Sequence, residues 1–546
     1  MSELIASQTP HLTLRVHTLD NVRVALTDLP AGTVIEDQEG VNVTLPGPVR
    51  HKHKFVLSDM AVGEMVIMYG VRVGKVTQAI AAGEAITTEN LVHSTEDLSA
   101  NTHQDAWQPP EVTAFETTTF DGYHRPDGRV GTANVWLVVP LVFCENRNIE
   151  VLRQCVADAL GDDPFHDYKR MARQLLHGEG AAESALPAGE RLFPNVDGVR
   201  FLVHQLGCGG TDGDAGALCD LLAGYICHPN VAGATVLSLG CQKAQISMLQ
   251  AAISARDPEG YKPVSYFEQQ QSTSEEALIR DALTAIFDGL KQANQVTRQP
   301  APLSELTLGV ECGGSDGFSG LSANPLVGAV VDRLVALGGS GILSEFPELC
   351  GVEHELLARC GDPQVAERFT SLMGAYQRHA QAVGADFSMN PSPGNVRDGL
   401  ITDAMKSAGA AKKGGDSPVV DVLDYTEPMT RKGLNLLCTP GNDVESTTGL
   451  VGSGANVVLF TTGLGTPTGN PVAPVIKISS NSELARRMSD VIDFDAGPII
   501  RGEADIAELA DQLLSLCIDT ASGRYVTKAV RLSQLDFIPW KRGVSL

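Results

Sequence analysis

Residues 308–325, LGVECGGSDGFSGLSANP, have the pattern of a strand, a glycine-rich turn and a helix. Residues 308–311 are apolar enough to end a buried strand, and 323–337 have the spacing of a helix. Between them lies a turn of small and polar residues that includes Cys312, Ser315 and Asp316. A strand, a glycine-rich turn and a helix in this order build ligand sites at the carboxyl end of a parallel sheet. The alternative is an ordinary structural turn between a strand and a helix.

The size and charge of the chain restrict the classes of protein that it can belong to. With 546 residues, it is too long for one core, so two to four domains are expected. A content of 43% hydrophobic and 20% charged residues is typical of a soluble globular protein. The net charge of −25 argues against partners that are nucleic acids or anionic membranes. An anionic substrate would therefore need a local cationic or metal-containing pocket.

The cysteines and the N-terminus indicate a cytoplasmic protein. There are 11 cysteines, an odd number, and no secretory signal precedes them. No apolar run approaches the ~20 residues of a transmembrane helix. We therefore expect reduced thiols.

The chain divides into three regions by its pattern of apolar residues. Residues 1–97 read as short strands broken by turns, and 98–115 are polar and proline-containing, which predicts a linker. Residues 116–298 and 303–546 alternate strand and helix, which predicts two α/β domains with mainly parallel sheets. A second linker is expected at 294–302. In the last region helices are expected at 323–337, 364–383, 397–409, 481–491 and 504–520.

Several motifs recur in one order along the chain. ECGGSDGFSG is followed by ANP, by NPSPGN at 390–395, by PGND at 440–443 and by GTPTG at 465–469. In these motifs the chain resembles the altronate/galactarate dehydratase family. The resemblance implies an N-terminal SAF-type, β-clip-like domain. It also implies a hydro-lyase that removes water from a sugar acid, D-altronate giving 2-dehydro-3-deoxy-D-gluconate, with galactarate as the nearest alternative.

The implied reaction removes a weakly acidic proton next to a carboxylate, so a divalent metal that grips the carboxylate is expected. Imidazole and carboxylate ligands suit Fe²⁺ or Mn²⁺. The residues that we expect to bind it are His17, His53 and Glu311. The family usually has Gly before this His, whereas this chain has Lys52.

Other polar residues in the matching motifs are candidates for proton transfer and substrate binding. His53, Lys54, His204 and Asp316 are the candidate catalytic residues. The candidate substrate-binding residues are Asn134, Ser315, Asn324, Asn395 and Asn442. Each has a structural alternative, such as a capped turn or a hydrogen bond to a neighbouring loop.

Four cysteines follow predicted strands beside glycines or polar turns: Cys144, Cys208, Cys241 and Cys312. Packing under tight turns is one interpretation. The other is that they converge and hold an iron–sulfur cluster, although short CxxC spacing is absent.

Two further functions are a dinucleotide-binding enzyme and a non-catalytic binding protein. GLGTPTG at 463–469 is not a dinucleotide fingerprint, because its spacing differs and Pro467 prevents an immediate helix. Leu464 stands where the family commonly has Arg, which leaves the identity of the sugar acid open. A non-catalytic sugar-acid-binding protein is the alternative from another class, and a homo-oligomer is compatible with the sequence.

Overall fold

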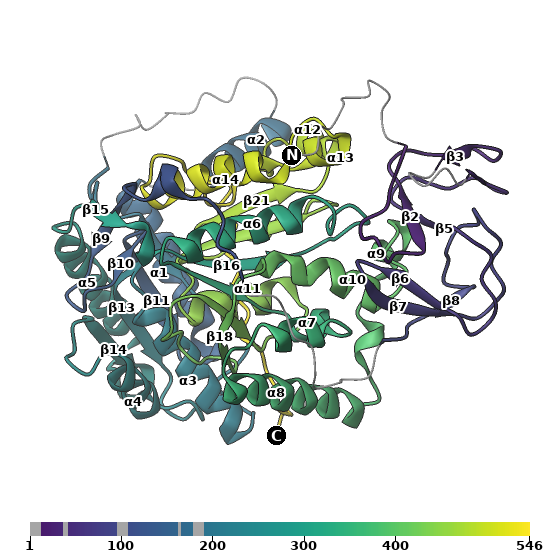
Figure 1. The fold of residues 1–546 in the computed structure, drawn as a ribbon. Helices are drawn as coiled ribbons and strands as arrows, with labels where there is room; N and C mark the ends of the chain where they lie inside the picture. The colour runs from purple at the N-terminus through teal and green to yellow at the C-terminus, as the bar shows by residue number, and fades with distance from the viewer. Residues whose placement is uncertain (1–11, 37–41, 96–106, 162–164, 178–190) are drawn as a thin grey trace.

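The computed structural model describes residues 12–36, 42–95, 107–161, 165–177 and 191–546, and its strands fall into three regions along the chain (Figure 1). A strand-rich N-terminal region is followed by two α/β regions with parallel sheets. This confirms the predicted fold class. Among the described residues, no helix is both long and apolar enough to cross a membrane.

The N-terminal region is built from short antiparallel strands. β6 and β7 show why they form, since their buried residues alternate with more exposed ones at the period of a strand with one face inward. The strands are β1 (Thr13–Leu14), β2 (Val22–Ala25), β3 (Val34–Glu36), β4 (Asn42–Thr44), β5 (Lys54–Val56), β6 (Met65–Met68), β7 (Val71–Val76) and β8 (Leu91–Val92).

The second region is a four-stranded parallel sheet in the order β12-β11-β13-β14. β11 reads VWLVVP and is buried along its whole length, as strands covered on both faces are. The strands are β11 (Val135–Pro140), β12 (Gly198–Phe201), β13 (Val231–Ser238) and β14 (Val264–Glu268). The helices are α1 (Asn146–Leu160), α2 (His166–His177), α3 (Asp212–Ile226), α4 (Ile246–Arg256) and α5 (Glu275–Ala293).

The third region is a seven-stranded parallel sheet in the order β18-β19-β17-β16-β20-β21-β22. Its strands are β16 (Thr307–Cys312), β17 (Ser340–Leu343), β18 (Val419–Leu423), β19 (Leu434–Leu437), β20 (Val457–Thr462), β21 (Val475–Ser479) and β22 (Phe494–Asp495). Its helices are α6 (Ala323–Ala336), α7 (Glu353–Ala358), α8 (Pro363–Ala382), α9 (Pro393–Arg397), α10 (Asp403–Ala410), α11 (Asp443–Gly452), α12 (Ser482–Arg487), α13 (Gly497–Arg501), α14 (Ile506–Ala521) and α15 (Lys528–Arg531).

The strand order fixes where a ligand site can form in this sheet. The connection through α6 runs from β16 to β17, and the connection through α11 runs the other way, from β19 to β20. Right-handed crossovers in opposite directions place α6 and α11 on opposite faces of the sheet. The neighbouring strands β16 and β20 therefore flank a switch point, and the crevice beyond their carboxyl ends is where such sheets bind ligands.

The structure differs from the expected local structure in several places. The predicted linker at 294–302 contains strand β15 (Gln299–Pro302), which pairs with β9 (Thr119–His124) at the edge of a small sheet that β10 (Val130–Gly131) completes. An edge strand tolerates its two prolines, because their missing N–H groups can face away from the partner. The predicted helix at 397–409 is split into α9 and α10, because Gly399 has a φ of +91°. Helix α11 was not predicted. Of the predicted linker 98–115, residues 98–106 lie outside the described residues, and 113–115 form a 3₁₀ turn.

The N-terminal region lies against the third region beside α9 and α10 (Figure 1). The Lys54 ammonium donates to the Gly399 carbonyl at 2.7 Å, and the Thr402 hydroxyl donates to the Val73 carbonyl at 2.6 Å. One continuous hydrophobic core contains Val73 of the first region and Leu308 of the third. The strand-rich region is thus a fixed neighbour of the carboxyl end of the seven-stranded sheet.

Candidate active site

A group of charged side chains is buried at the carboxyl ends of β16, β17 and β19. We call it the buried charge cluster: Glu311, Cys312, Glu345, Glu348, Lys406, Lys413 and Asp443. Glu311 and Cys312 end β16, the glutamates 345 and 348 follow β17, and Asp443 opens the helix after β19. Burying so many charges is costly unless each has a partner.

Two lysines provide most of that compensation. The Lys413 ammonium lies 2.7 Å from Glu345 Oε2 and 2.9 Å from Cys312 Sγ. The Lys406 ammonium lies 2.6 Å from Glu348 Oε1 and 2.8 Å from the side-chain oxygen Oδ1 of Asn390. Although burial opposes ionisation, the charges of Lys406 and Lys413 lower the pKa of Glu348. These contacts make two ion pairs out of reach of water.

Several acids of the cluster hold their protons more tightly than usual, Glu311 and Cys312 among them. Burial, followed by the charge of Glu345, raises the pKa of Glu311 well above its usual value. Its Oε2 accepts from Ser344 and Ser446 at 3.0 and 2.6 Å, whereas Oε1 has no hydrogen-bond partner among the described residues. Burial likewise raises the pKa of the Cys312 thiol. Both shifts favour the protonated forms of these groups.

Glu345 and Asp443 have further properties typical of functional sites. Glu345 has a φ of +66°, a strained conformation for a residue with a side chain. Burial and the neighbouring glutamates raise the pKa of Asp443 to about 7. A Cβ at Gly313 would fall 1.9 Å from Asp443 Oδ2, so only glycine lets the β16 turn approach this carboxylate.

A second group of polar side chains lies where the N-terminal region meets the third region. We call it the interface cluster: Lys52, His53, Lys54, Asp316 and Asp398. The Lys52 ammonium lies 2.9 Å from Asp316 Oδ2 and 3.4 Å from Asp398 Oδ1. Asp316 is completely buried and accepts hydrogen bonds from three further side chains, those of Ser319, Ser480 and Asn481. Its carboxylate is therefore turned inward, where it links the two regions.

Lys54 and His53 lie beside this carboxylate. Burial lowers the pKa of Lys54 to about 7, and the charge of Asp316 only partly opposes this. Burial also lowers the pKa of His53, whose Nε2 lies 3.0 Å from the Arg397 carbonyl. Five candidate residues lie where the two regions meet. The structure brings three of them together: His53, Lys54 and Asp316. It also places Ser315 and Asn395 beside them, since Asn395 donates to the Ser315 carbonyl at 2.8 Å.

The three expected metal ligands are not brought together. His17 is exposed, accepts from the Leu19 amide and lies against Gly70 within the N-terminal region. His53 contacts residues 397–398, and Glu311 lies in the buried charge cluster. Among the described residues, two groups place three metal-ligating side chains within 4.8 Å of one another: Cys312 with Glu345 and Glu348, and His93 with Cys350 and Asp403.

His204 and Asn134 belong to the framework of the second region. His204 uses both ring nitrogens on backbone groups, with Nε2 2.8 Å from the Pro140 carbonyl and Nδ1 accepting from the Leu206 amide. Burial lowers its pKa to about 4, so it stays neutral. The Asn134 side chain is fully buried and bonds Arg125 and two backbone carbonyls. The hydrogen bonds of both residues are those expected if the residues have a structural role.

The remaining candidates hold loops in place. Asn324 donates to the Gly409 carbonyl and accepts from Thr461, and Asn442 caps the start of α11. Both therefore shape the carboxyl edge of the sheet.

Three of the four expected cysteines lie on neighbouring loops, and the fourth lies elsewhere. The loops that carry Cys144, Cys208 and Cys241 follow β11, β12 and β13 and are joined by backbone hydrogen bonds, such as that from the Phe143 amide to the Leu206 carbonyl. Burial and then the nearby thiols Cys208 and Cys241 raise the pKa of Cys144, and all three thiols are exposed. Cys312 lies instead in the other sheet, against Lys413. All 11 cysteines are free.

Two surface cavities of the described residues lie away from both clusters. One of about 830 Å³ is lined by residues that include Trp107, Arg333 and Arg359, and another of about 550 Å³ lies between α1 and α5. Neither is lined by a cysteine or by any residue of the two clusters. We therefore place the candidate active site at the carboxyl edge, on chemistry and topology rather than on cavity size.

Comparisons with known proteins agree with this organisation. Three sequence profiles match in order: the "Altronate/galactarate dehydratase SAF domain" at 11–94, the "D-galactarate dehydratase/Altronate hydrolase, second domain" at 122–294, and the "D-galactarate/Altronate dehydratase, C-terminal" at 303–545. The chain is 34% identical to altronate dehydratase of Escherichia coli, over 98% of this chain and 99% of the relative. The chain belongs to the altronate/galactarate dehydratase family.

Other relatives are similar to this chain over most of their own length. Altronate dehydratase of Bacillus subtilis is 32% identical over 94% of this chain and 95% of its own. Galactarate dehydratase (L-threo-forming) of Escherichia coli is 34% identical over 94% and 93%. The (2R)-sulfolactate sulfo-lyase subunit beta of Chromohalobacter salexigens is 31% identical over 77% of this chain and 96% of its own. As a member of this dehydratase family, the chain is a hydro-lyase with an N-terminal SAF domain.

Most residues of the buried charge cluster were not predicted from the sequence of this chain. Glu345 and Glu348 follow a predicted strand within SEFPEL, and Lys413 lies in AKKGG at 411–415. Charged residues directly after a buried strand were the available signal for the glutamates. Nothing local marks the lysines, because they reach the cluster from helix α10 and the turn that follows it.

Proposed function

We propose that the chain is a metal-dependent dehydratase that converts D-altronate to 2-dehydro-3-deoxy-D-gluconate in the cytoplasm. The observation that carries the proposal is the buried charge cluster at the switch point of the seven-stranded sheet, in a chain whose full-length relatives include two altronate dehydratases. Galactarate remains the alternative substrate, because a galactarate dehydratase is equally similar.

Removal of water from an aldonate needs a base for the proton next to the carboxylate and an acid for the departing hydroxyl. Proton transfer is most efficient when the pKa of the group lies near the working pH. Lys54 and Asp443 are the two groups of the carboxyl edge with pKa values of about 7. We assign proton transfer to these two residues, and charge compensation of the substrate carboxylate to Lys406 and Lys413.

A divalent cation fits the donor set of Cys312, Glu345 and Glu348 once protons leave the cluster. One ligand atom of each lies within 4.8 Å of the other two, and an oxygen of Glu311 and one of Glu345 lack hydrogen-bond partners. Because burial raises the pKa of Cys312, binding of Fe²⁺ or Mn²⁺ would be coupled to loss of the thiol proton. When bound, such a metal would polarise the substrate carboxylate.

An iron–sulfur cluster is a second kind of metal centre that this chain could hold. Cys144, Cys208 and Cys241 form a three-thiol site to which an iron–sulfur cluster could bind, with Cys312 excluded by its place in the other sheet. Iron and acid-labile sulfide analysis after anaerobic purification separates the two proposals. Sulfide present in wild type and lost in Cys241→Ser assigns the cluster, whereas iron without sulfide assigns the single metal.

A substrate panel tests the proposed function. The metal-stripped chain, reloaded anaerobically with Fe²⁺, Mn²⁺ or Zn²⁺, is assayed with altronate, mannonate, galactarate, glucarate and small 2-hydroxy acids for the 2-keto-3-deoxy product. We expect altronate to be the best substrate and Fe²⁺ or Mn²⁺, rather than Zn²⁺, to restore activity. Preference for galactarate moves the assignment to the alternative, and binding without turnover of any acid would support a non-catalytic binding protein.

A further inference from the structure

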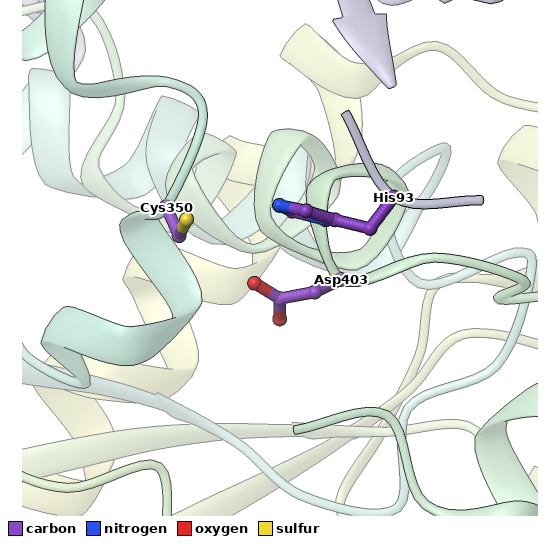
Figure 2. A group of neighbouring side chains, drawn as sticks. All are labelled: His93, Cys350 and Asp403. Carbon is purple, nitrogen blue, oxygen red and sulfur yellow. The ribbon is translucent and has the colours of Figure 1, made fainter. Parts of the chain in front are cut away.

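His93, Cys350 and Asp403 come together from three separate segments. His93 follows β8 in the SAF domain, Cys350 ends the 3₁₀ turn after β17, and Asp403 is the first residue of α10. One ligand atom of each lies within 4.8 Å of the other two. Figure 2 shows the imidazole extending toward Cys350, with the Asp403 carboxylate beside both. None of the three belongs to the buried charge cluster or to the interface cluster.

Asp403 is a buried carboxyl group with unmet bonding capacity. It is fully buried, and apart from the neighbouring Cys350 thiol its oxygens have no hydrogen-bond partner among the described residues. Burial, followed by the charge of Glu348, raises its pKa well above the usual value. The nearest ammonium, Lys406, is already paired with Glu348. A buried carboxyl group without a partner is costly, and a bound cation would satisfy it.

His93 and Cys350 are suited to supply the other ligands. Burial lowers the pKa of His93, which keeps the imidazole in the neutral form that binds metals. Burial and the nearby carboxyl groups of Glu353 and Asp403 raise the pKa of Cys350, so its thiol is protonated while no cation is present. A thiolate and a carboxylate together would neutralise a divalent ion, and binding would release the thiol proton.

We propose that His93, Cys350 and Asp403 bind a divalent transition metal of the zinc class, which clamps the SAF domain to α10 and the turn after β17. Neutral imidazole, thiolate and carboxylate are the three ligand types that zinc takes, at about 2.0–2.3 Å. A solvent molecule completes the tetrahedron. The three side chains must move closer on loading, and the 3.3 Å contact from the Ala404 amide to His93 Nδ1 must lengthen so that Nδ1 can carry the ring proton.

The position explains what such a metal would do. Besides the contact from Ala404 to His93, the domains are joined here by the hydrogen bond from Thr402 to the Val73 carbonyl and by the approach of Thr95 to Gly351. Asp403 lies one helical turn before Lys406, whose ammonium pairs with Glu348. The metal would therefore fix both the SAF domain and the start of the helix that carries a lysine of the buried charge cluster, without being part of that cluster.

Cobalt substitution tests this site independently of catalysis. The reduced, metal-stripped full-length chain is titrated anaerobically with Co²⁺, and the near-ultraviolet thiolate-to-cobalt band is recorded for wild type, Cys350→Ser, His93→Asn and Cys312→Ser. We expect Cys350→Ser to lose one equivalent of thiolate-bound Co²⁺, and His93→Asn to weaken that site at least tenfold. The matched Cys312→Ser control should keep it.

Zinc binding gives a second readout that does not depend on colour. We expect one equivalent of Zn²⁺ to raise the Tm of wild type by several degrees, and to have no such effect on His93→Asn. Near-ultraviolet circular dichroism verifies that each variant is folded. Equal cobalt bands in wild type and Cys350→Ser, or an equal zinc-dependent rise in Tm in wild type and His93→Asn, would overturn the proposal.

Discussion

At the scale of single residues, the buried charge cluster depends on partners that water cannot replace. Lys413 is 1% exposed and lies between Glu345 and Cys312, whereas its neighbour Lys412 is 35% exposed and 3.5 Å from Glu355. The two lysines are adjacent in the sequence and differ in burial, so they form a matched pair for mutation.

Replacing Lys413 by methionine should destabilise the fold severely. The variant leaves Glu345 buried without its cation, and breaking a buried ion pair from one side costs about 3–5 kcal/mol. Lys412→Met removes a partly exposed pair, which is worth less than about 1 kcal/mol. Urea unfolding of both variants measures the difference. Equal losses of unfolding free energy would mean that Lys413 is not the counter-ion that the geometry indicates.

The residue scale also shows what the sequence could and could not predict. The stretch at 308–325 correctly marked the turn after β16, because a buried strand followed by small and polar residues is a local pattern. It did not predict that Asp316 faces inward, since its partners Lys52, Ser480 and Asn481 come from distant segments. Likewise, His204 fitted a family motif, but its backbone partners depend on how β11 and β12 pair.

At the scale of elements, strand β5 carries a lysine whose charge opposes folding. Lys54 is the first residue of β5 and is fully buried, and burial lowers its pKa from 10.5 to about 7. The folded chain therefore binds this proton less tightly than the unfolded chain does. The resulting destabilisation is fully present below pH 7, decreases as the pH rises and disappears above about pH 10.5.

The variant Lys54→Met should make this dependence visible. It keeps the buried stem but loses the hydrogen bond to the Gly399 carbonyl. The unfolding free energy of the variant minus that of wild type should be largest near pH 6 and should decrease between pH 7 and 10. Denaturant unfolding at four pH values measures this trend. A difference between the two proteins that is constant with pH would contradict the lowered pKa of Lys54.

The helices and strands were predictable only in part. The apolar runs at 134–141 and 306–311 predicted buried parallel strands, and both are there as β11 and β16. The break between α9 and α10 was missed because residues 397–409 contain few strong breakers. Gly399 must be glycine there, since a Cβ would fall 2.3 Å from the Lys52 carbonyl of the SAF domain, a contact that no local pattern shows.

At the scale of the whole molecule, the SAF domain is joined to the active-site edge by polar contacts and by a shared core. Lys52, Lys54 and His93 all reach the third region from it. One relative, named a subunit, matches 77% of this chain. That coverage suggests testing whether residues 113–546 and the SAF domain can function as separate chains.

The fragment 113–546 should lose both stability and turnover. Its hydrophobic core would be exposed where Val73 and Met68 now cover it, and Asp316 would lose its ion pair with Lys52. We expect a lower Tm and at least a 10²-fold fall in kcat with altronate, partly restored by adding residues 1–97 as a second chain. Turnover by the fragment at the full-length rate would place catalysis entirely outside the SAF domain.

The most direct test of the site at the carboxyl edge is the turnover of altronate by Asp443→Asn, compared with Glu445→Gln in the same first turn of α11. Both variants remove one acidic group from the start of α11, but only Asp443 belongs to the buried charge cluster. We predict that Asp443→Asn lowers kcat by about 10²–10⁴-fold while its Tm stays close to wild type, and that Glu445→Gln stays near the wild-type rate. A wild-type rate in Asp443→Asn would contradict the assignment of the reaction to this edge of the sheet.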